Sequence, residues 1–173
     1  MRPRVSVYIA ISLDQCIARD DGGLDWLAGV QDSKEDYGYA AFMATVDAVV
    51  LGRSTYDTVL GFDSWPFADK RVVVLTHRPL TPRFGESVHA GALAPLMATL
   101  ASQDVRRVYL DGGVTIRQGL EEEIVDDLTL SLVPVILGGG RPLFSDGLPE
   151  SAWRLESAQA YPSGLAQVRY SRR

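Results

Sequence analysis

Short apolar runs alternate with amphipathic segments along the first two thirds of the chain. The runs are rich in β-branched residues and leucine, and they occupy residues 5–12, 48–51, 72–75 and 108–110. Each run is nearly continuous rather than alternating, which is typical of strands in a sheet that is covered on both faces. The pattern therefore predicts four buried strands.

The segments between these runs carry apolar residues at helical spacing. Three sets repeat every three or four residues: Tyr39, Phe42, Met43 and Val46; Leu93, Leu96, Met97 and Leu100; Ile116, Leu120 and Ile124. Each set would place one apolar stripe of a helix against a sheet. Strands that alternate with helices indicate a mainly parallel sheet with helices on both faces.

The C-terminal part of the chain has a different pattern. Residues 128–137 form a long strand-like run that Pro134 interrupts and three consecutive glycines end. A turn signal follows at 161–164, and residues 166–171 alternate as a closing strand. Hairpin-like strands at this end predict an antiparallel edge on the parallel sheet. Because we find no internal repeat, low-complexity segment or linker, we expect one α/β domain over residues 1–173.

Composition and charge narrow the class of protein. The chain has 173 residues and a net charge of -5, so bulk electrostatics do not favour a nucleic-acid partner. Cys16 is the sole cysteine, which excludes an intrachain disulfide and makes a reducing compartment the simplest expectation. The apolar run at 5–11 is too short to span a membrane. We expect a cytoplasmic protein with neither a membrane nor a nucleic-acid partner.

Several common catalytic signatures are missing from the sequence. It contains no GxxxxGKS or GxxxxGKT loop, no GxGxxG fingerprint and no GxSxG elbow. His77 and His89 do not form an HExxH pair, and the His-x-Glu and Pro-Cys-x-x-Cys signatures of zinc deaminases are absent. We therefore expect no metal site.

Glycine, hydroxyl and arginine residues follow the predicted strands, where open α/β sheets place their ligands. The first such exit combines Gly52 with Arg53, Ser54 and Thr55. Glycine allows close backbone approach, a helix start offers free N–H groups, and a guanidinium suits phosphate oxygens. The alternative is an ordinary strand–turn–helix junction with a surface arginine.

Two further strand exits have similar chemistry. Thr76, His77 and Arg78 follow the third run and offer three donors to a 2′-phosphate, although this motif taken alone favours the alternative, a polar loop that ends at a proline. Gly112 and Gly113 follow the fourth run and open backbone amides to a phosphate. The alternative there is a tight turn with a helix cap. We expect Gly52, Thr76 and Gly112 to share one cleft.

A fourth feature is the stretch from Ala10 to Trp26, where a strand leads into an acidic loop that contains glycine. A long loop of this kind after a strand suits an active-site lid. The alternative is an ordinary surface loop.

The order and spacing of these motifs resemble the dihydrofolate reductase superfamily over nearly the whole chain. The resemblance rests on residues 5–18, 52–55 and 112–113. Within the superfamily, residues 111–113 and 133–144 are most similar to the reductase domain of riboflavin biosynthesis and its stand-alone relatives. The resemblance implies a three-layer αβα fold with a mainly parallel central sheet and an antiparallel C-terminal edge strand.

The resemblance also implies a role for each site residue. The cofactor would be NADPH, with the nicotinamide at Ala10 and Ile17, the phosphates at Gly52, Arg53, Ser54 and Thr55, the 2′-phosphate at Thr76 and Arg78, and the pyrophosphate at Gly112, Gly113, Val114 and Thr115. The substrate would contact Tyr39, Phe42, Tyr56 and Ser131.

The catalytic acid is the point where the sequence departs from dihydrofolate reductases, which carry a carboxylate one turn before a phenylalanine. Phe42 is the matching aromatic residue, but Gly38 lies one turn earlier. Counting back without gaps from Gly52 reaches Asp36 instead, which makes Asp36 a candidate for the catalytic acid. Asp36 equally fits a solvated position at an acidic helix start over 32–36.

These features predict an NADPH-dependent reductase that transfers a hydride to a pterin-like or pyrimidine-like molecule. One alternative is the 5-amino-6-(5-phosphoribosylamino)uracil reductase of riboflavin biosynthesis, for which Arg141 is a candidate phosphate contact. Another is a nucleotide-binding protein that keeps the fold without turnover. The related riboflavin-type reductases also imply a homodimer.

Overall fold

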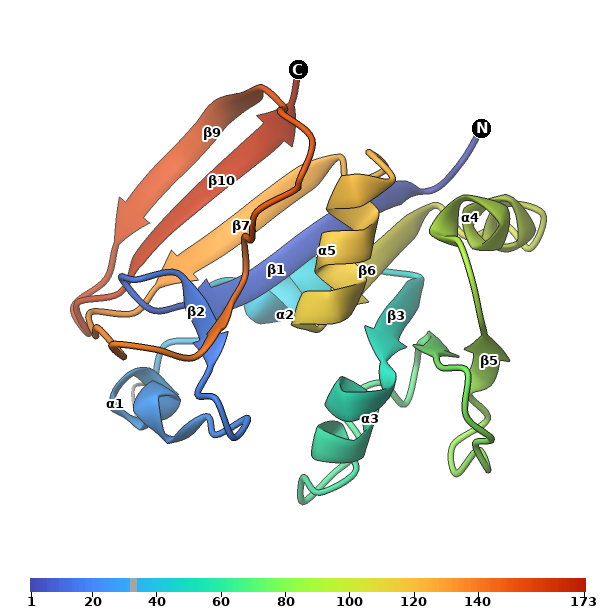
Figure 1. Cartoon of the computed structure of the whole chain (residues 1–173), viewed down its shortest axis with the longest axis horizontal. Coiled ribbons are helices and arrows are strands. Elements are labelled where there is room, and N and C mark those ends of the chain that lie inside the picture. Colours follow the sequence, from blue (N-terminus) through green and yellow to red (C-terminus); the bar gives the residue numbers. More distant parts are fainter. Residues whose placement is uncertain (32–33) are drawn as a thin grey trace.

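The four strands predicted from the apolar runs all form, and they lie together in one sheet (Figure 1). The computed structural model describes residues 1–31 and 34–173. Within these residues the main sheet has the order β5-β4-β3-β6-β1-β7-β10-β9. Its strands are β1 (Arg4–Ile11), β3 (Ala48–Gly52), β4 (Arg71–Leu75), β5 (Ser87–His89), β6 (Arg107–Asp111), β7 (Asp127–Leu132), β9 (Trp153–Ala160) and β10 (Ala166–Arg172). The pairings from β5 across to β7 are parallel, whereas β10 and β9 are antiparallel, as the C-terminal pattern predicts.

Helices cover both faces of the sheet and make the fold a three-layer αβα arrangement. On one face, α4 (Leu93–Ala101) and α5 (Gly113–Glu121) pack with the larger apolar core. The opposite face is covered by α2 (Tyr39–Met43) and α3 (Arg53–Val59). Figure 1 shows α5 in front of the strands and α2 behind them. The predicted fold class is confirmed.

Burial on both faces explains why the strands are apolar at every position. In β3, Val49 and Leu51 pack with the core beside α3, whereas Ala48 and Val50 pack with the core beside α4 and α5. Successive side chains of a strand point to opposite faces, so both sets must be apolar when both faces are covered.

The run at 128–137 is not one strand, which corrects the sequence-based expectation. Strand β7 ends at Leu132, two residues before Pro134, whose ring nitrogen cannot donate to a ladder. The chain then continues to β8 (Arg141–Pro142), which pairs with β2 (Cys16–Ala18) in a separate two-stranded sheet. The C-terminal half of the run therefore borders the loop that follows β1.

The end of α5, the segment after β1 and the short strand β5 also differ from what the sequence pattern predicts. The apolar stripe of α5 reaches Ile124, but the helix ends at Glu121 and the next residues turn, with Glu123 at a φ of 55°. The segment after β1 contains a 3-10 turn, η1 (Asp25–Leu27), and the short helix α1 (Ala28–Gln31). Strand β5 has only three residues, too few to show a period.

An apolar cavity of about 370 Å³ lies beside the far end of α5. Leu120 of α5 and Leu130 of β7 line it, together with Phe144 and Leu148 of the segment that crosses this face. In Figure 1 this segment runs in front of β10 and β7.

No helix of the described chain combines the length and the apolar character that a membrane span requires.

Candidate functional site

The carboxyl ends of the parallel strands meet at one edge of the sheet. Gly52 at the end of β3 pairs with Leu75 at the end of β4, and Leu51 pairs with Asp111 at the end of β6. Gly52, Thr76 and Gly112 therefore follow neighbouring strands and lie on the same edge. This is the arrangement that the strand-exit motifs predict.

Glycines bring the turns at this edge into close contact. Gly112 has a φ of 90°, and a Cβ at this position would overlap the Thr55 hydroxyl. A Cβ at Gly113 would overlap the Ile17 side chain. A Cβ at Gly52 would stand 3.1 Å from Thr115 Oγ1. The exits of β3 and β6 and strand β2 thus approach one another to distances that favour glycine.

Thr115, in the first turn of α5, has an unpaired buried hydroxyl. Its side chain is fully buried, and its Oγ1 has no hydrogen-bond partner among the described residues. A buried hydroxyl without a partner costs about 1–3 kcal/mol. The Val114 side chain beside it is 78% exposed, so the start of α5 is open to solvent. An orphaned donor beside free helix amides marks a place where a ligand oxygen would fit.

The turn after β4 separates a buried threonine from an exposed arginine. Thr76 is buried, and its Oγ1 accepts a hydrogen bond from the backbone N of Arg78 at 3.0 Å. The Arg78 side chain and His77 are exposed. The Thr76 hydroxyl shapes the turn, while the Arg78 guanidinium is available to a ligand.

The start of α3 presents Arg53 and Ser54 at the same edge. Arg53 Nε lies 2.9 Å from Asp57 Oδ1, and its Nη1 donates to the Pro79 carbonyl at 3.1 Å. Ser54 is exposed. Arg53 therefore ties α3 to the turn after β4.

The loop after β1 is fastened by one carboxylate. Asp14 accepts hydrogen bonds from Ser12 Oγ at 2.6 Å, from Leu137 N at 3.0 Å and from Gly138 N at 2.9 Å. These hydrogen bonds, of which the one from Ser12 has the largest effect, lower the pKa of Asp14 to about 2.

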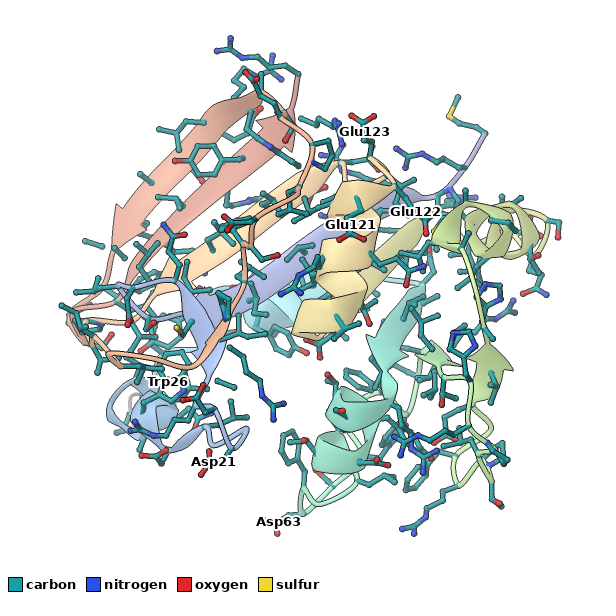
Figure 2. The ribbon with its side chains drawn as sticks, viewed as in Figure 1. Asp21, Trp26, Asp63, Glu121, Glu122 and Glu123 are labelled. Atoms are coloured by element: carbon teal, nitrogen blue, oxygen red, sulfur yellow. The ribbon has the colours of Figure 1, made fainter. Side chains whose placement is uncertain are left out.

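Trp26 follows this loop and is buried with Val133, below β2 in Figure 2.

Aromatic side chains gather on the α2 side of β1 and β6. The ring centroid of Tyr8 lies 4.8 Å from that of Phe42 and 5.5 Å from that of Tyr39. The Phe42 ring also meets Tyr109 edge-on at 5.2 Å. Tyr39 is 36% exposed, so this cluster reaches the surface. Its planar faces suit a flat heterocycle.

A buried amide connects the cluster to β7. Gln167 Nε2 donates to Ser131 Oγ and to Tyr8 Oη, both at 3.0 Å. Tyr8 Oη in turn donates to the backbone carbonyl of Tyr37. Ser131, a predicted substrate contact, is 5% exposed and already accepts this bond. Its hydroxyl thus belongs to a network that holds Tyr8 in place.

Tyr56 does not reach the site, which corrects its predicted role in substrate binding. Its side chain is 1% exposed in the core beside α3, and its Oη donates to Glu86 Oε1 at 3.0 Å. The residue directly follows the motif at 52–55, but the helical turn of α3 directs it inward.

Asp36 lies at a helix start rather than in the site. It is exposed, and its carboxylate accepts hydrogen bonds from Gly38 N at 2.9 Å and Ala40 N at 3.1 Å. These amides lower the pKa of Asp36, whereas a proton donor needs a raised pKa. The contacts fit the helix-start alternative and give the acid role no support. Asp32 lies outside the described residues.

Asp111 is the carboxyl group that the sequence reasoning missed. It ends β6 directly before Gly112, whose backbone N donates to Asp111 Oδ1 at 2.9 Å. Burial raises the pKa of Asp111 despite this bond. Burial, with the charge of Asp111 next, also raises the pKa of Tyr39 to about 12. The available signal was an acidic residue at the end of an otherwise apolar strand.

Comparison with known proteins agrees with this architecture. The fold is that of the dihydrofolate reductase-like class: dihydrofolate reductase from Enterococcus faecalis, solved with NADP(H), superposes with a TM-score of 0.69 at 16% identity, over 98% of this chain and 96% of that one. Residues 3–167 match the RibD C-terminal domain model, and the chain belongs to that family.

Two relatives match over the whole length. A putative riboflavin biosynthesis protein from Shewanella sp. PV-4 has a TM-score of 0.90 and 35% identity, covering 100% of this chain and 99% of that one. The uncharacterized protein YwjB of Bacillus subtilis is 33% identical over 176 residues, which cover 99% of both chains.

Proposed function

We propose that the protein is an NADPH-dependent reductase that acts on a pterin-like or pyrimidine-like ring. The observation that carries the proposal is the unpaired, fully buried Thr115 hydroxyl in the cradle formed by the turn at Gly112 and Gly113 and the solvent-open start of α5. Such a cradle fits a pyrophosphate, because amides at a helix start and a hydroxyl donor both face anionic oxygens. The similarity in fold to a reductase that was solved with NADP(H) supports the same proposal.

Each part of the edge has a role in holding the cofactor. Residues 112–115 would contact the pyrophosphate, and Arg78 would meet the 2′-phosphate. Ala10 and Ile17 would border the nicotinamide, since Ile17 packs against Gly113 and Ala10 lies near the end of β1. When bound, NADPH supplies a hydride from its nicotinamide ring. The chain supplies orientation and excludes water.

Asp111 is the proton donor of the proposed reaction. A carboxyl group with a raised pKa keeps its proton at a higher pH than a free aspartate does. Asp111 lies at the end of β6, directly before Gly112 of the cradle. The aromatic rings of Tyr8, Tyr39 and Phe42 would stack on the substrate. Gln167 and Ser131 hold Tyr8 in the orientation that this stacking needs.

The test is NADPH oxidation, followed by absorbance, with a panel of folate-type and pyrimidine-type substrates. The proposal expects turnover with at least one of them, and a tighter Kd for NADPH than for NADH. Tight NADPH binding without turnover over the panel would favour the non-catalytic alternative. Failure to bind NADPH would contradict the proposal.

The family match favours one specific substrate as a second candidate, the phosphoribosylamino-pyrimidine of riboflavin biosynthesis. That substrate needs a cationic contact for its phosphate. Arg141 borders the loop after β1, and its guanidinium donates to the Asp20 carbonyl at 3.2 Å. A preference for the phosphorylated pyrimidine that Arg141→Ala removes would support this candidate.

A further inference from the structure

Arg117, in the middle of α5, has a buried polar atom without a partner. Its Nε is buried and makes no hydrogen bond to any described residue. Seven other arginines form ion pairs within 4 Å in the described chain, and Arg117 is not among them: Arg2, Arg4, Arg19, Arg53, Arg107, Arg154 and Arg172. Glu121, one turn further along the helix, does not pair with it. A buried N–H of a charged group is costly when it has no acceptor.

Helix geometry puts the Arg117 guanidinium near the start of α5. Side chains on a helix lean toward its N-terminus, so the head of Arg117 covers the turn that begins at Gly113. Arg117 follows Gly113 by four residues and shares its face, which contacts Ile17 of β2. The three glutamates 121–123 lie at the opposite end of the helix (Figure 2).

The first turn of α5 offers further donors at the same end of the helix. The first amides of a helix have no acceptor within it, and the first bond in α5 runs from Ile116 N to the Gly112 carbonyl. The Thr115 hydroxyl is also unpaired and fully buried. Thr115 lies on the side of α5 toward Gly52, whereas Arg117 shares the side of Gly113 toward Ile17, so the two unpaired donors flank the free amides. A pyrophosphate, which has two phosphate groups, would give oxygens to both sides of the helix start.

We propose that Arg117 is a phosphate-binding residue, which clamps the pyrophosphate of the dinucleotide from the side of α5 that faces β2. The proposal rests on the proposed function and adds to it a cation outside the strand-exit motifs. Because both nicotinamide dinucleotides share the pyrophosphate, Arg117 contributes equally to NADPH and NADH. Arg78 differs, since only NADPH carries the 2′-phosphate.

The test compares Arg117→Met and Arg117→Lys with a matched control, Arg106→Met. Arg106 is exposed just before β6, at the opposite end of that strand from Gly112. Kd values for NADPH and NADH are measured by calorimetry. Thermal stability of the unliganded protein is measured with and without inorganic pyrophosphate.

The proposal expects Arg117→Met to raise both Kd values by the same factor, about 10- to 100-fold. Arg117→Lys should fall in between, since it keeps the charge and loses the planar fork. Unliganded Arg117→Met should have an unchanged or higher Tm, because it removes an unpaired buried donor. Pyrophosphate at one fixed concentration should stabilise the wild type and the Arg106→Met control, and should stabilise Arg117→Met clearly less.

Three results would overturn it. Unchanged Kd values would remove the phosphate contact, and a loss confined to NADPH would assign Arg117 to the 2′-phosphate. A large fall in the Tm of both Arg117 variants would show that the side chain serves packing. If the wild type binds neither dinucleotide but pyrophosphate stabilises it through Arg117, the dinucleotide proposal fails and the Arg117 site stands.

Discussion

Replacing Gly112 by alanine tests the contact on which the site depends. The residue has a φ of 90°, which costs an L-residue about 1–3 kcal/mol. The added Cβ also overlaps the Thr55 hydroxyl in the first turn of α3, and overpacking of this kind costs about 1–3 kcal/mol more. Relief requires either that Thr55 changes its χ1 rotamer or that the two strand exits move apart.

Gly147 provides a matched control for this experiment. It has a φ of 91°, but a Cβ there has open space around it. Urea unfolding of both variants separates the two costs: Gly147→Ala should lose only the backbone contribution, and Gly112→Ala should lose about 1–3 kcal/mol more. Adding Thr55→Gly to Gly112→Ala should recover much of the difference. Equal losses in the two single variants, or no recovery, would refute the close approach of the two exits.

Three further substitutions have expected outcomes. Asp111→Asn should lower kcat by about 10²- to 10⁴-fold, with the exposed Asp104→Asn as control. Since the pKa of Asp111 is raised by burial, its contribution to stability is complete below the ordinary value of 3.8 and is lost as the pH rises through the folded-state value. Asp111→Asn should therefore raise the Tm at neutral pH, and an unchanged Tm would argue against burial of the charge. Asp14, with a pKa of about 2, stabilises the fold above pH 3.8 and ceases to do so as the pH falls toward 2. Asp14→Asn should speed hydrogen exchange at the amides of 137–138 at neutral pH, and exchange at the wild-type rate would contradict the role of its carboxylate. Arg78→Ala should raise the Kd for NADPH more than that for NADH, and equal effects would remove the argument for a 2′-phosphate contact.

The positions of the strands, the motifs that follow them and the apolar faces of the helices all depend on local sequence patterns. For this reason the sequence predicts them. A continuous apolar run such as that at β3 indicates a strand that is buried on both faces. The glycines at 112–113 indicate that the backbone there comes close to another part of the chain. The run at 128–137 shows the limit of this reasoning. Val135 and Leu137, after Pro134, pack with Trp26 and Val30, and a periodicity argument cannot tell that contact from a strand.

The proposed acid, Asp111, could not be predicted from the sequence in the same way. Asp36 and Asp111 are both single aspartates near a motif, and their pKa values move in opposite directions because of what surrounds them. Asp36 receives amide hydrogen bonds in solvent, and Asp111 is covered by elements that are distant in sequence. The prediction that Tyr56 binds substrate was wrong for a related reason. The direction of its side chain depends on the helical turn of α3 and not on its place beside the motif at 52–55.

Backbone hydrogen bonds join the loop after β1 to a segment more than a hundred residues away. Leu13 N donates to the Val135 carbonyl at 2.8 Å, and Leu143 N donates to the Gln15 carbonyl at 2.9 Å. Neither segment can swing outward without the other, and Phe144, a wall of the apolar cavity, directly follows the second anchor. Access to the proposed nicotinamide position beside Ile17 and the shape of the cavity should thus change together when these segments move. Amides on both segments should exchange with solvent as one cooperative unit, at one shared opening free energy.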